Sequence, residues 1–419
     1  MSPIATLITM ILVLSVITAS KYLLYIFSSP LYRLSKKKLL KDSKNMTDEE
    51  IQNATKISVV VPAWNEEVGI IQAITSLLTS HYDNLEVIVV NDGSTDSTHE
   101  VVQQFIKEGI DGLTNKKKKF KYFLKENGGK GSALNYGIKK ASGDVIVTMD
   151  ADTVFEKDAL ITVARYFQNK DIDAAVGNVK VANSKNIIGI IQQIEYTVGF
   201  YFKRTHSFFN SEYIIGGAFG VFRRETFEEN GFFNVDIKTE DIELSTRLQN
   251  NGCKIIYIED AIAYTEGPVT FSGLLKQRLR WKKGRLDTFI LHKNLFFSKD
   301  SKHNKFLTHY LLPITLFYEI ELLLEPFITI FGVYYLYATH DFRALVLWML
   351  FTTSINVITF IFGSRKNSKL AFLFIPFYFL LSYILTVIEI YAMYESVRLI
   401  IVKKDVVWQK WDRKGISTV

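Results

Sequence analysis

The sequence contains a single cysteine, Cys253, so it cannot form an internal disulfide bond. A disulfide-stapled scaffold and a cysteine-rich zinc site are both excluded, because each needs several thiols. Charged residues are also sparse, at 22%, whereas 48% of the residues are hydrophobic and 14% are aromatic. This composition excludes a disordered or collagen-like chain, and it is too apolar for a wholly soluble domain. The chemistry of any functional site must therefore come from carboxylates, amides and basic groups.

The excess of positive charge is small and clustered. The chain has 50 Lys and Arg residues against 43 Asp and Glu residues, which gives a net charge of +7. A nucleic-acid-binding surface would spread such charge, whereas here it is gathered in clusters. We therefore expect a lipid bilayer as a partner and no nucleic acid.

Residues 3–27 form a hydrophobic run that is long enough to cross the bilayer core as a helix. A cleaved signal peptide is the alternative, but no charged start precedes the run and no convincing cleavage site follows it. The residues that follow are basic: Arg33, Lys36, Lys37, Lys38 and Lys41. Basic flanks of a span stay on the cytoplasmic side, so residues 1–30 are predicted as a transmembrane helix and the next segment as cytosolic.

From Ile57 onward, short β-branched runs alternate with helical stretches. Predicted strands at 57–63, 85–92 and 145–149 are separated by predicted helices, among them 66–80 and 97–109. Strands that are apolar throughout indicate a parallel sheet covered on both faces. Residues 31–265 are therefore predicted to form a cytosolic α/β domain of the nucleotide-binding type.

Hydrophobic density returns after Phe306 in three blocks, at 309–337, 344–363 and 370–394, each long enough to span a membrane. Three glutamates in the first block predict an interfacial early half and a span at 322–337. We expect amphipathic interfacial helices over 266–305, transmembrane helices over 306–402 and a basic tail over 403–419. The protein is then a multi-pass cell-membrane protein. Four crossings from an external start put the carboxyl terminus outside, whereas the basic tail favours the inside; both arrangements stay open.

Two acidic motifs follow predicted strands. Asp92 ends the second strand, at the edge where open α/β sheets bind ligands, although a simple turn with Ser94 or Asp96 as helix cap is the alternative. Asp150 and Asp152 follow the strand at 145–149, and two carboxylates at a strand end suit Mg²⁺ or Mn²⁺ with a diphosphate as a further ligand. An isolated D-x-D is also common in ordinary loops.

Two further motifs lie toward the end of the cytosolic stretch. The T-E-D triplet at 239–241 either contains a functional acid or is only the start of a helix that Thr239 caps. The Q-R-L-R-W run at 277–281 lies in a basic amphipathic stretch, for which an interfacial helix is the alternative. Lys130 and Asn135 lie in a Gly-rich segment, where they either contact the phosphates or ribose of a nucleotide or form part of a helix start. Gly217 either lets the backbone approach a bound sugar or occupies a tightly packed position.

This ordered set of motifs resembles the family 2 inverting glycosyltransferases, and among them the membrane-embedded processive polysaccharide synthases. The matching residues are V-P-A-W-N-E-E (61–67), N-D-G-S-T-D (91–96), G-K-G-S-A-L-N (129–135), D-A-D (150–152), V-G-N (176–178), T-E-D (239–241) and Q-R-L-R-W (277–281). The resemblance covers roughly residues 57–281 and the flanking membrane segments. It implies a GT-A type α/β fold with a mostly parallel sheet, joined to α-helical transmembrane segments.

The resemblance also implies roles for individual residues. Asp241 is the expected catalytic base. The donor-binding residues are Asp92, Asp150, Glu66, Lys130 and Arg280; the acceptor-binding residues are Trp281, Gln277, Glu240 and Gly217; and the metal ligands for Mg²⁺ or Mn²⁺ are Asp150 and Asp152. An arginine can pair with a diphosphate, and an indole offers a flat face for a sugar ring.

Within this group, the V-G-N, T-E-D and W-x-x-W-D-R segments look most like bacterial poly-β-1,6-N-acetyl-D-glucosamine synthases. The resemblance implies polymerisation of N-acetylglucosamine from UDP-GlcNAc onto a growing glycan, coupled to export and biofilm formation, with a small accessory membrane subunit as a further partner. The alternatives are a hyaluronan, chitin-oligosaccharide or cellulose-type synthase, a non-processive glycolipid glucosyltransferase, and a catalytically silent membrane scaffold.

Overall fold

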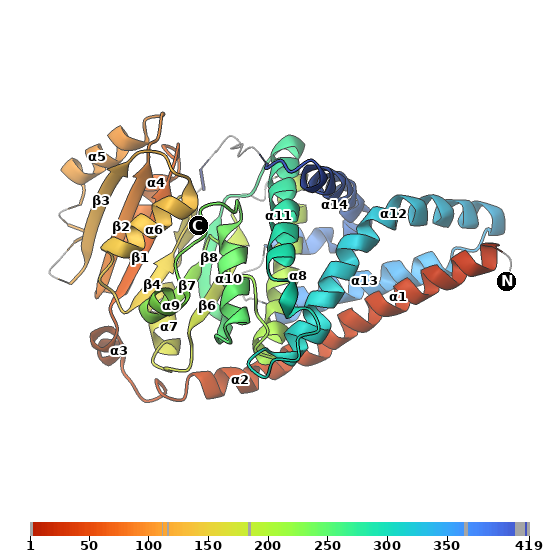
Figure 1. Cartoon of the computed structure of the whole chain (residues 1–419), viewed down its shortest axis with the longest axis horizontal. Helices are drawn as coiled ribbons and strands as arrows, with labels where there is room; N and C mark the ends of the chain where they lie inside the picture. The colour runs from red at the N-terminus through yellow and green to blue at the C-terminus, as the bar shows by residue number, and fades with distance from the viewer. Residues whose placement is uncertain are drawn as a thin grey trace.

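The computed structural model describes residues 3–110, 112–114, 117–182, 186–363, 368–406 and 415–416. Figure 1 shows a sheet-containing domain on one side and long helices that project from it on the other, with the amino terminus at the far end of these helices. Gly415 lies beside the sheet-containing domain, where its backbone N–H donates a 3.2 Å hydrogen bond to Glu266 Oε2. Trp408, Trp411 and the W-x-x-W-D-R segment lie outside the described residues, so expectations for this part of the tail stay predictions.

The domain is built on one eight-stranded sheet. Its strands are β1 (Ile57–Ala63), β2 (Leu85–Asp92), β3 (Lys119–Lys125), β4 (Val145–Thr148), β5 (Thr153–Phe155), β6 (Ala174–Val181), β7 (Gly220–Arg223) and β8 (Ile255–Thr265). The strand order is β3-β2-β1-β4-β7-β6-β8-β5. The β3-β2-β1-β4 half is parallel throughout, β6 and β8 are also parallel, and β7 and β5 run antiparallel to their neighbours. The predicted bounds of β1 and β2 are confirmed.

Helices cover both faces of the sheet, as the apolar strands predict. The domain helices are α2 (Tyr32–Leu39), α3 (Asp48–Ala54), α4 (Ile70–Leu78), α5 (Thr98–Glu108), α6 (Lys130–Lys140), α7 (Ala159–Tyr166), α9 (Arg224–Asn230) and α10 (Glu240–Asn250). Alternate residues of a strand point to opposite faces. Accordingly, Val59 and Val61 pack with α4 and α7, whereas Val60 packs with α6 and α10.

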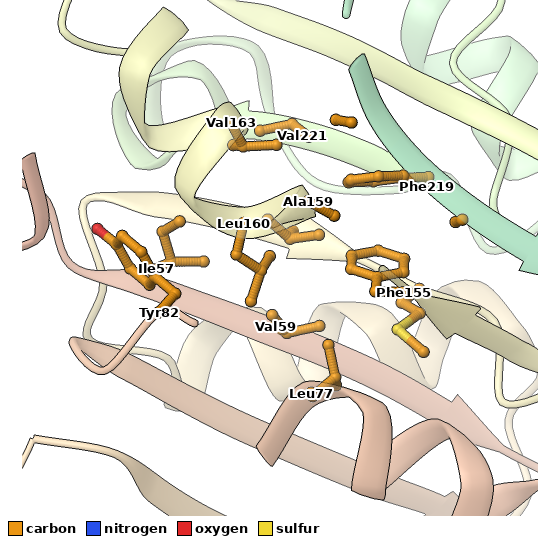
Figure 2. Close-up of a cluster of buried hydrophobic side chains, with 14 of the residues drawn as sticks. Ile57, Val59, Leu77, Tyr82, Phe155, Ala159, Leu160, Val163, Phe219 and Val221 are labelled. Carbon is orange, nitrogen blue, oxygen red and sulfur yellow. The ribbon is translucent and has the colours of Figure 1, made fainter. Parts of the chain in front are cut away.

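The larger core cluster lies between β1, α4 and α7 (Figure 2). Ile57 and Val59 of β1 meet Leu77 of α4 and Leu160 of α7 in this cluster. The rings of Phe155 and Phe219 close it near the middle of the sheet, with centroids 4.0 Å apart. This core fixes the strand ends that carry the acidic motifs.

The helical part consists of α1 (Pro3–Ser28), α8 (Ile187–Phe208), α11 (Phe271–Leu291), α12 (Leu312–Thr339), α13 (Arg343–Phe362) and α14 (Lys369–Ile401). Short helical turns at Ser29–Leu31, Lys293–Leu295 and Leu307–Leu311 connect these elements. In Figure 1, α11 stands between the sheet and the projecting helices α1, α12 and α13.

Three of the described helices are long and apolar enough to cross a membrane, namely those at Ile8–Leu39, Arg343–Phe362 and Lys369–Ile401. The first merges α1 with the basic helix α2. The helix α12, whose later half the sequence predicts as a span, is not among the three. It is one continuous helix that carries Pro326 and three glutamates. The crossing at 322–337, and with it the number of crossings, stays a prediction.

Candidate active site

All of the residues to which the family resemblance assigns a role line one cavity of about 1060 Å³. They are Glu66, Asp92, Lys130, Asp150, Asp152, Gly217, Glu240, Asp241, Gln277, Arg280 and Trp281. The parallel pairing of β2, β1 and β4 explains part of this, because the carboxyl ends of parallel strands meet at one edge of the sheet. The D-A-D triplet and Asp92 therefore reach the same cavity from different strands. Asn135 does not line it, because its amide exchanges hydrogen bonds with the backbone of Phe233.

Asp92 is held by the Gly-rich segment that precedes α6. Its carboxylate accepts hydrogen bonds from the backbone N–H groups of Gly128 and Gly129 and from Lys125 Nζ, which lies 2.5 Å away. The Gly128 N–H lies within hydrogen-bond distance of both carboxylate oxygens, so this segment fixes the orientation of Asp92. Gly93 and Gly129 both have positive φ, which lets the two loops approach. The sequence does not predict the contact between Lys125 and Asp92, because Lys125 ends β3 whereas Asp92 ends β2.

Loops after β1 and β2 are tied to each other. The backbone N–H of Asn65 donates to Ser94 Oγ at 2.9 Å, and that of Glu66 donates to Thr98 Oγ1 at 2.8 Å. Asp96 accepts hydrogen bonds from Thr98 at the start of α5. The helix-cap interpretation of the N-D-G-S-T-D motif is therefore partly correct, and the same motif also holds Glu66 in place.

Lys130 joins the two acidic motifs. Its Nζ lies 2.6 Å from Asp150 Oδ1 and 3.5 Å from Glu240 Oε1. Burial disfavours the charged ammonium, but the carboxylates of Asp150, Glu240 and Asp241 outweigh it and raise the pKa of Lys130 above its usual range. Burial also raises the pKa of Glu240, an effect that Lys130 opposes and Asp241 reinforces.

Gly217 lies against this lysine. A Cβ atom at position 217 would lie 2.2 Å from Lys130 Nζ and 3.3 Å from Asp150 Oδ1. The tight-packing interpretation of this glycine is therefore confirmed. Its backbone N–H also donates a 2.8 Å hydrogen bond to Asp241 Oδ2.

We expect Gly217→Ala to displace the Lys130 ammonium from Asp150 while the domain stays folded, because the clash falls on the end of a flexible side chain. The loss of a charge-assisted bond predicts a donor KM raised about tenfold. Gly216→Ala is the matched control, since a Cβ at position 216 meets no atom within 4 Å. Steady-state kinetics of both variants with a thermal melt check this, and equal donor KM values would contradict it.

The T-E-D triplet begins α10, as predicted. Asp241 Oδ1 accepts from the N–H of Ile242 at 2.9 Å, and its other oxygen accepts from the N–H of Gly217, so the two hydrogen bonds fix the direction of the carboxylate. The capping prediction for Thr239 is wrong: its side chain makes no cap bond, and its hydroxyl has no hydrogen-bond partner among the described residues. Helix α11 occupies that space, because a Cβ at Gly284 would lie 2.0 Å from Thr239 Oγ1.

One face of α11 turns to the cavity. Residues 277, 280, 281 and 284 follow the helical repeat and share this face. No hydrogen bond or ion pair joins Arg280 to the part of the chain that the structure describes, so it is one of the lining cations available to an anionic ligand. The buried amide of Gln277 leaves its Oε1 without a partner among the same residues.

Asp150 and Asp152 have the chemistry of a Mg²⁺ or Mn²⁺ site but do not complete one. Asp152 Oδ1 accepts a 3.3 Å hydrogen bond from the hydroxyl of Thr265, which holds this carboxylate beside the end of β8. Within the described ranges, no group of three or more His, Cys, Asp or Glu side chains could hold a metal. Such cations commonly take one or two carboxylates and obtain the rest of their ligands from phosphate and water.

The cavity continues toward the helical part. Beyond the motif residues it is lined by Lys21 and Tyr25 of α1, by Lys203 and His206 of α8, and by Thr315 of α12. The site is thus shared between the sheet domain and the helices that project from it. No motif predicts this part of the lining, because its residues come from helices far apart in the sequence.

Comparisons with known proteins agree with this architecture. The model of "Glycosyl transferase family 2" matches residues 58–231, and that of "Glycosyl transferase family group 2" matches residues 145–391. A poly-beta-1,6-N-acetyl-D-glucosamine synthase of Staphylococcus epidermidis is 33% identical over 272 residues, which are 64% of this chain and 61% of that protein. Its counterpart from Staphylococcus aureus strain COL is 34% identical over 240 residues, 57% of this chain and 56% of that protein. The chain thus aligns with about three-fifths of the length of these relatives.

The solved structure of a mannosyltransferase, PcManGT from Pyrobaculum calidifontis in complex with GDP-Man and Mn²⁺, is similar with a TM-score of 0.56. The two are 18% identical, and the match covers 92% of this chain and 99% of that one. This likeness confirms the GT-A type fold. Because a family model spans more than half of the sequence and its motifs converge on one cavity, the chain belongs to glycosyl transferase family group 2.

Proposed function

We propose that this protein is an inverting, processive glycosyltransferase that polymerises N-acetylglucosamine from UDP-GlcNAc into a β-1,6-linked exopolysaccharide. The convergence on one cavity of all residues to which the family resemblance assigns a role carries the proposal. The identity to poly-beta-1,6-N-acetyl-D-glucosamine synthases supports the choice of sugar and linkage. The extension of the cavity to α1, α8 and α12 supports export of the product across the membrane, which is the step that biofilm formation would need.

In this proposal the donor lies between the sheet edge and α11. Asp92 and Glu66 bind the nucleoside side, while Lys130 and Arg280 pair with the diphosphate. Asp150 and Asp152 would hold Mg²⁺ or Mn²⁺, which neutralises charge that develops on the leaving diphosphate.

Asp241 is the proposed base. It takes the proton from the acceptor hydroxyl as this hydroxyl attacks the anomeric carbon from the side opposite the diphosphate. A single in-line displacement converts an α-linked donor sugar into a β-linked product. Its hydrogen bonds from Gly217 and Ile242 fix the direction of the Asp241 carboxylate. Trp281, with Gln277, Glu240 and Gly217, binds the acceptor, the indole by stacking against a sugar ring.

The first test is release of UDP by purified membranes supplied separately with UDP-GlcNAc, UDP-glucose and UDP-glucuronic acid. We expect turnover of UDP-GlcNAc alone, its loss on chelation with EDTA and its recovery with Mg²⁺ or Mn²⁺. Asp152→Asn is expected to lose this activity while still inserting into membranes, because it removes one of the two carboxylates available to the cation. Wild-type rates in this variant would contradict the metal assignment.

The linkage is tested on the polymer itself. A β-1,6-N-acetylglucosaminidase is expected to digest the product to short oligosaccharides. A resistant product would favour a hyaluronan, chitin or cellulose-type synthase, and transfer of a single sugar to lipid would favour a glycolipid glucosyltransferase. Absence of UDP release from any donor would favour a binding scaffold. The same assay on the chain expressed alone tests whether an accessory subunit is needed.

A further inference from the structure

Helix α11 has a second face, which carries Arg278, Lys282 and Arg285 and points away from the T-E-D triplet. Its three cations each pair with carboxylates of other helices. Arg278 pairs with Glu195 of α8 and Glu389 of α14, Lys282 pairs with Glu389 and with Glu319 of α12, and Arg285 pairs with Glu319. These ion pairs form one continuous chain of alternating charge from α8 to α12. The interfacial interpretation, in which such cations point to lipid headgroups, does not describe these three residues.

Arg278 is the one member of this chain that also contacts the indole of Trp281. Its guanidinium carbon lies 4.6 Å from the centroid of the Trp281 ring. Two parallel hydrogen bonds of 2.7 and 2.6 Å join the guanidinium to the carboxylate of Glu195. The side chain of Arg278 is 5% exposed and that of Glu195 is 32% exposed, so water reaches this pair mainly from the Glu195 side.

A forked pair of this kind fixes the plane of the guanidinium, which a single lysine ammonium cannot do. The guanidinium in turn is a flat cationic surface against the ring, and indole is the aromatic group that attracts a cation most strongly. The orientation of Trp281 is thus linked through Arg278 to α8 and α14. Trp281 lines the cavity, and so does Glu195.

We propose that Arg278 and Glu195 are a positioning pair that holds the Trp281 ring in the orientation required to bind the acceptor glycan. The inference rests on the proposed function, in which Trp281 is the acceptor platform. Neither residue is among those to which the proposed function assigns the donor or the proton transfer. Arg278 lies inside the Q-R-L-R-W motif, but Glu195 lies on a helix that the sequence motifs do not mark.

The test uses the purified full chain in nanodiscs with saturating UDP-GlcNAc and a short β-1,6-linked N-acetylglucosamine oligosaccharide as the acceptor. We expect Arg278→Lys and Glu195→Gln each to raise the acceptor KM about tenfold, with donor KM unchanged within twofold. Lys282→Met is the matched control, because Lys282 belongs to the same chain of ion pairs but does not line the cavity. It is expected to lower the melting temperature and leave the acceptor KM within twofold of the wild-type value.

A double-mutant cycle with Trp281→Leu completes the test. Because Arg278 acts through the indole, Arg278→Lys is expected to add nothing to the acceptor KM once Trp281 has been replaced. Additive effects, an unchanged acceptor KM in Arg278→Lys, or an equal rise in Lys282→Met would each overturn the inference and leave the proposed function intact. If Trp281→Leu itself leaves the acceptor KM unchanged, the acceptor platform fails, and the positioning role fails with it.

Discussion

Replacement of Asp241 by asparagine is expected to lower the rate of UDP release from UDP-GlcNAc by about two to four orders of magnitude, the usual contribution of a general base. Asparagine has the shape of aspartate, but its single amide oxygen can keep only one of the two hydrogen bonds that Asp241 accepts, from Gly217 or from Ile242. It cannot accept a proton at neutral pH. The loss should therefore appear in kcat, with the donor KM changed little, and both are read from steady-state kinetics.

Asp236→Asn is the matched control for this prediction. Asp236 is an exposed carboxylate on the segment that leads into α10, and it does not line the cavity. We expect wild-type kinetics in this variant. An Asp241→Asn protein that retains more than a tenth of the wild-type kcat would contradict the assignment of the base, since the remaining rate would exceed what loss of a base permits.

Gly284→Ala is expected to inactivate the enzyme and to destabilise it. In most helix interiors alanine is more favourable than glycine by about 1 kcal/mol. Here the new Cβ would lie 2.0 Å from Thr239 Oγ1 and 2.4 Å from its Cγ2, so α11 and the T-E-D triplet must separate. Overpacking of this kind costs about 1–3 kcal/mol, and the separation moves Asp241 away from the face of α11 that carries Trp281.

A thermal melt and the UDP-release assay measure the two effects of this substitution. Gly332→Ala in α12 is the matched helical control, since a Cβ at position 332 meets no atom within 4 Å. It is expected to keep both the melting temperature and the activity. A Gly284→Ala protein with the melting temperature and activity of the wild type would show that α11 does not press on the T-E-D segment.

Local sequence patterns predict the sheet and the motif positions well. Apolar runs bounded by turn residues predict β1 and β2 with their observed ends, and α13 and α14 begin within one residue of their hydrophobic blocks. These elements follow from the spacing of side chains along a few turns or a single strand, which the sequence displays directly. The order of the strands and the insertion of β7 between β4 and β6 do not follow from it.

The candidate site shows more clearly what local sequence predicts and what depends on the tertiary structure. The types of residue at Asp150, Asp241 and Trp281 indicate their chemistry from the sequence. Contacts between distant parts of the fold are not predicted by the sequence. The hydrogen bonds from Gly128 and Gly129 to Asp92, the approach of Gly284 to Thr239 and the pairing of Arg278 with Glu195 join residues with no common local pattern.

The sequence by itself determined the family, the α/β class of the domain and the motif residues that line the cavity, because composition, periodicity and motif order are properties of short segments. The tertiary structure alone decided which donors and charges surround each of these residues. Thr239 fails as a cap because α11 takes the space beside it, and the cations of α11 pair with acids because α8, α12 and α14 pack against it. Contacts of this kind depend on how distant elements pack in three dimensions, which no local pattern encodes.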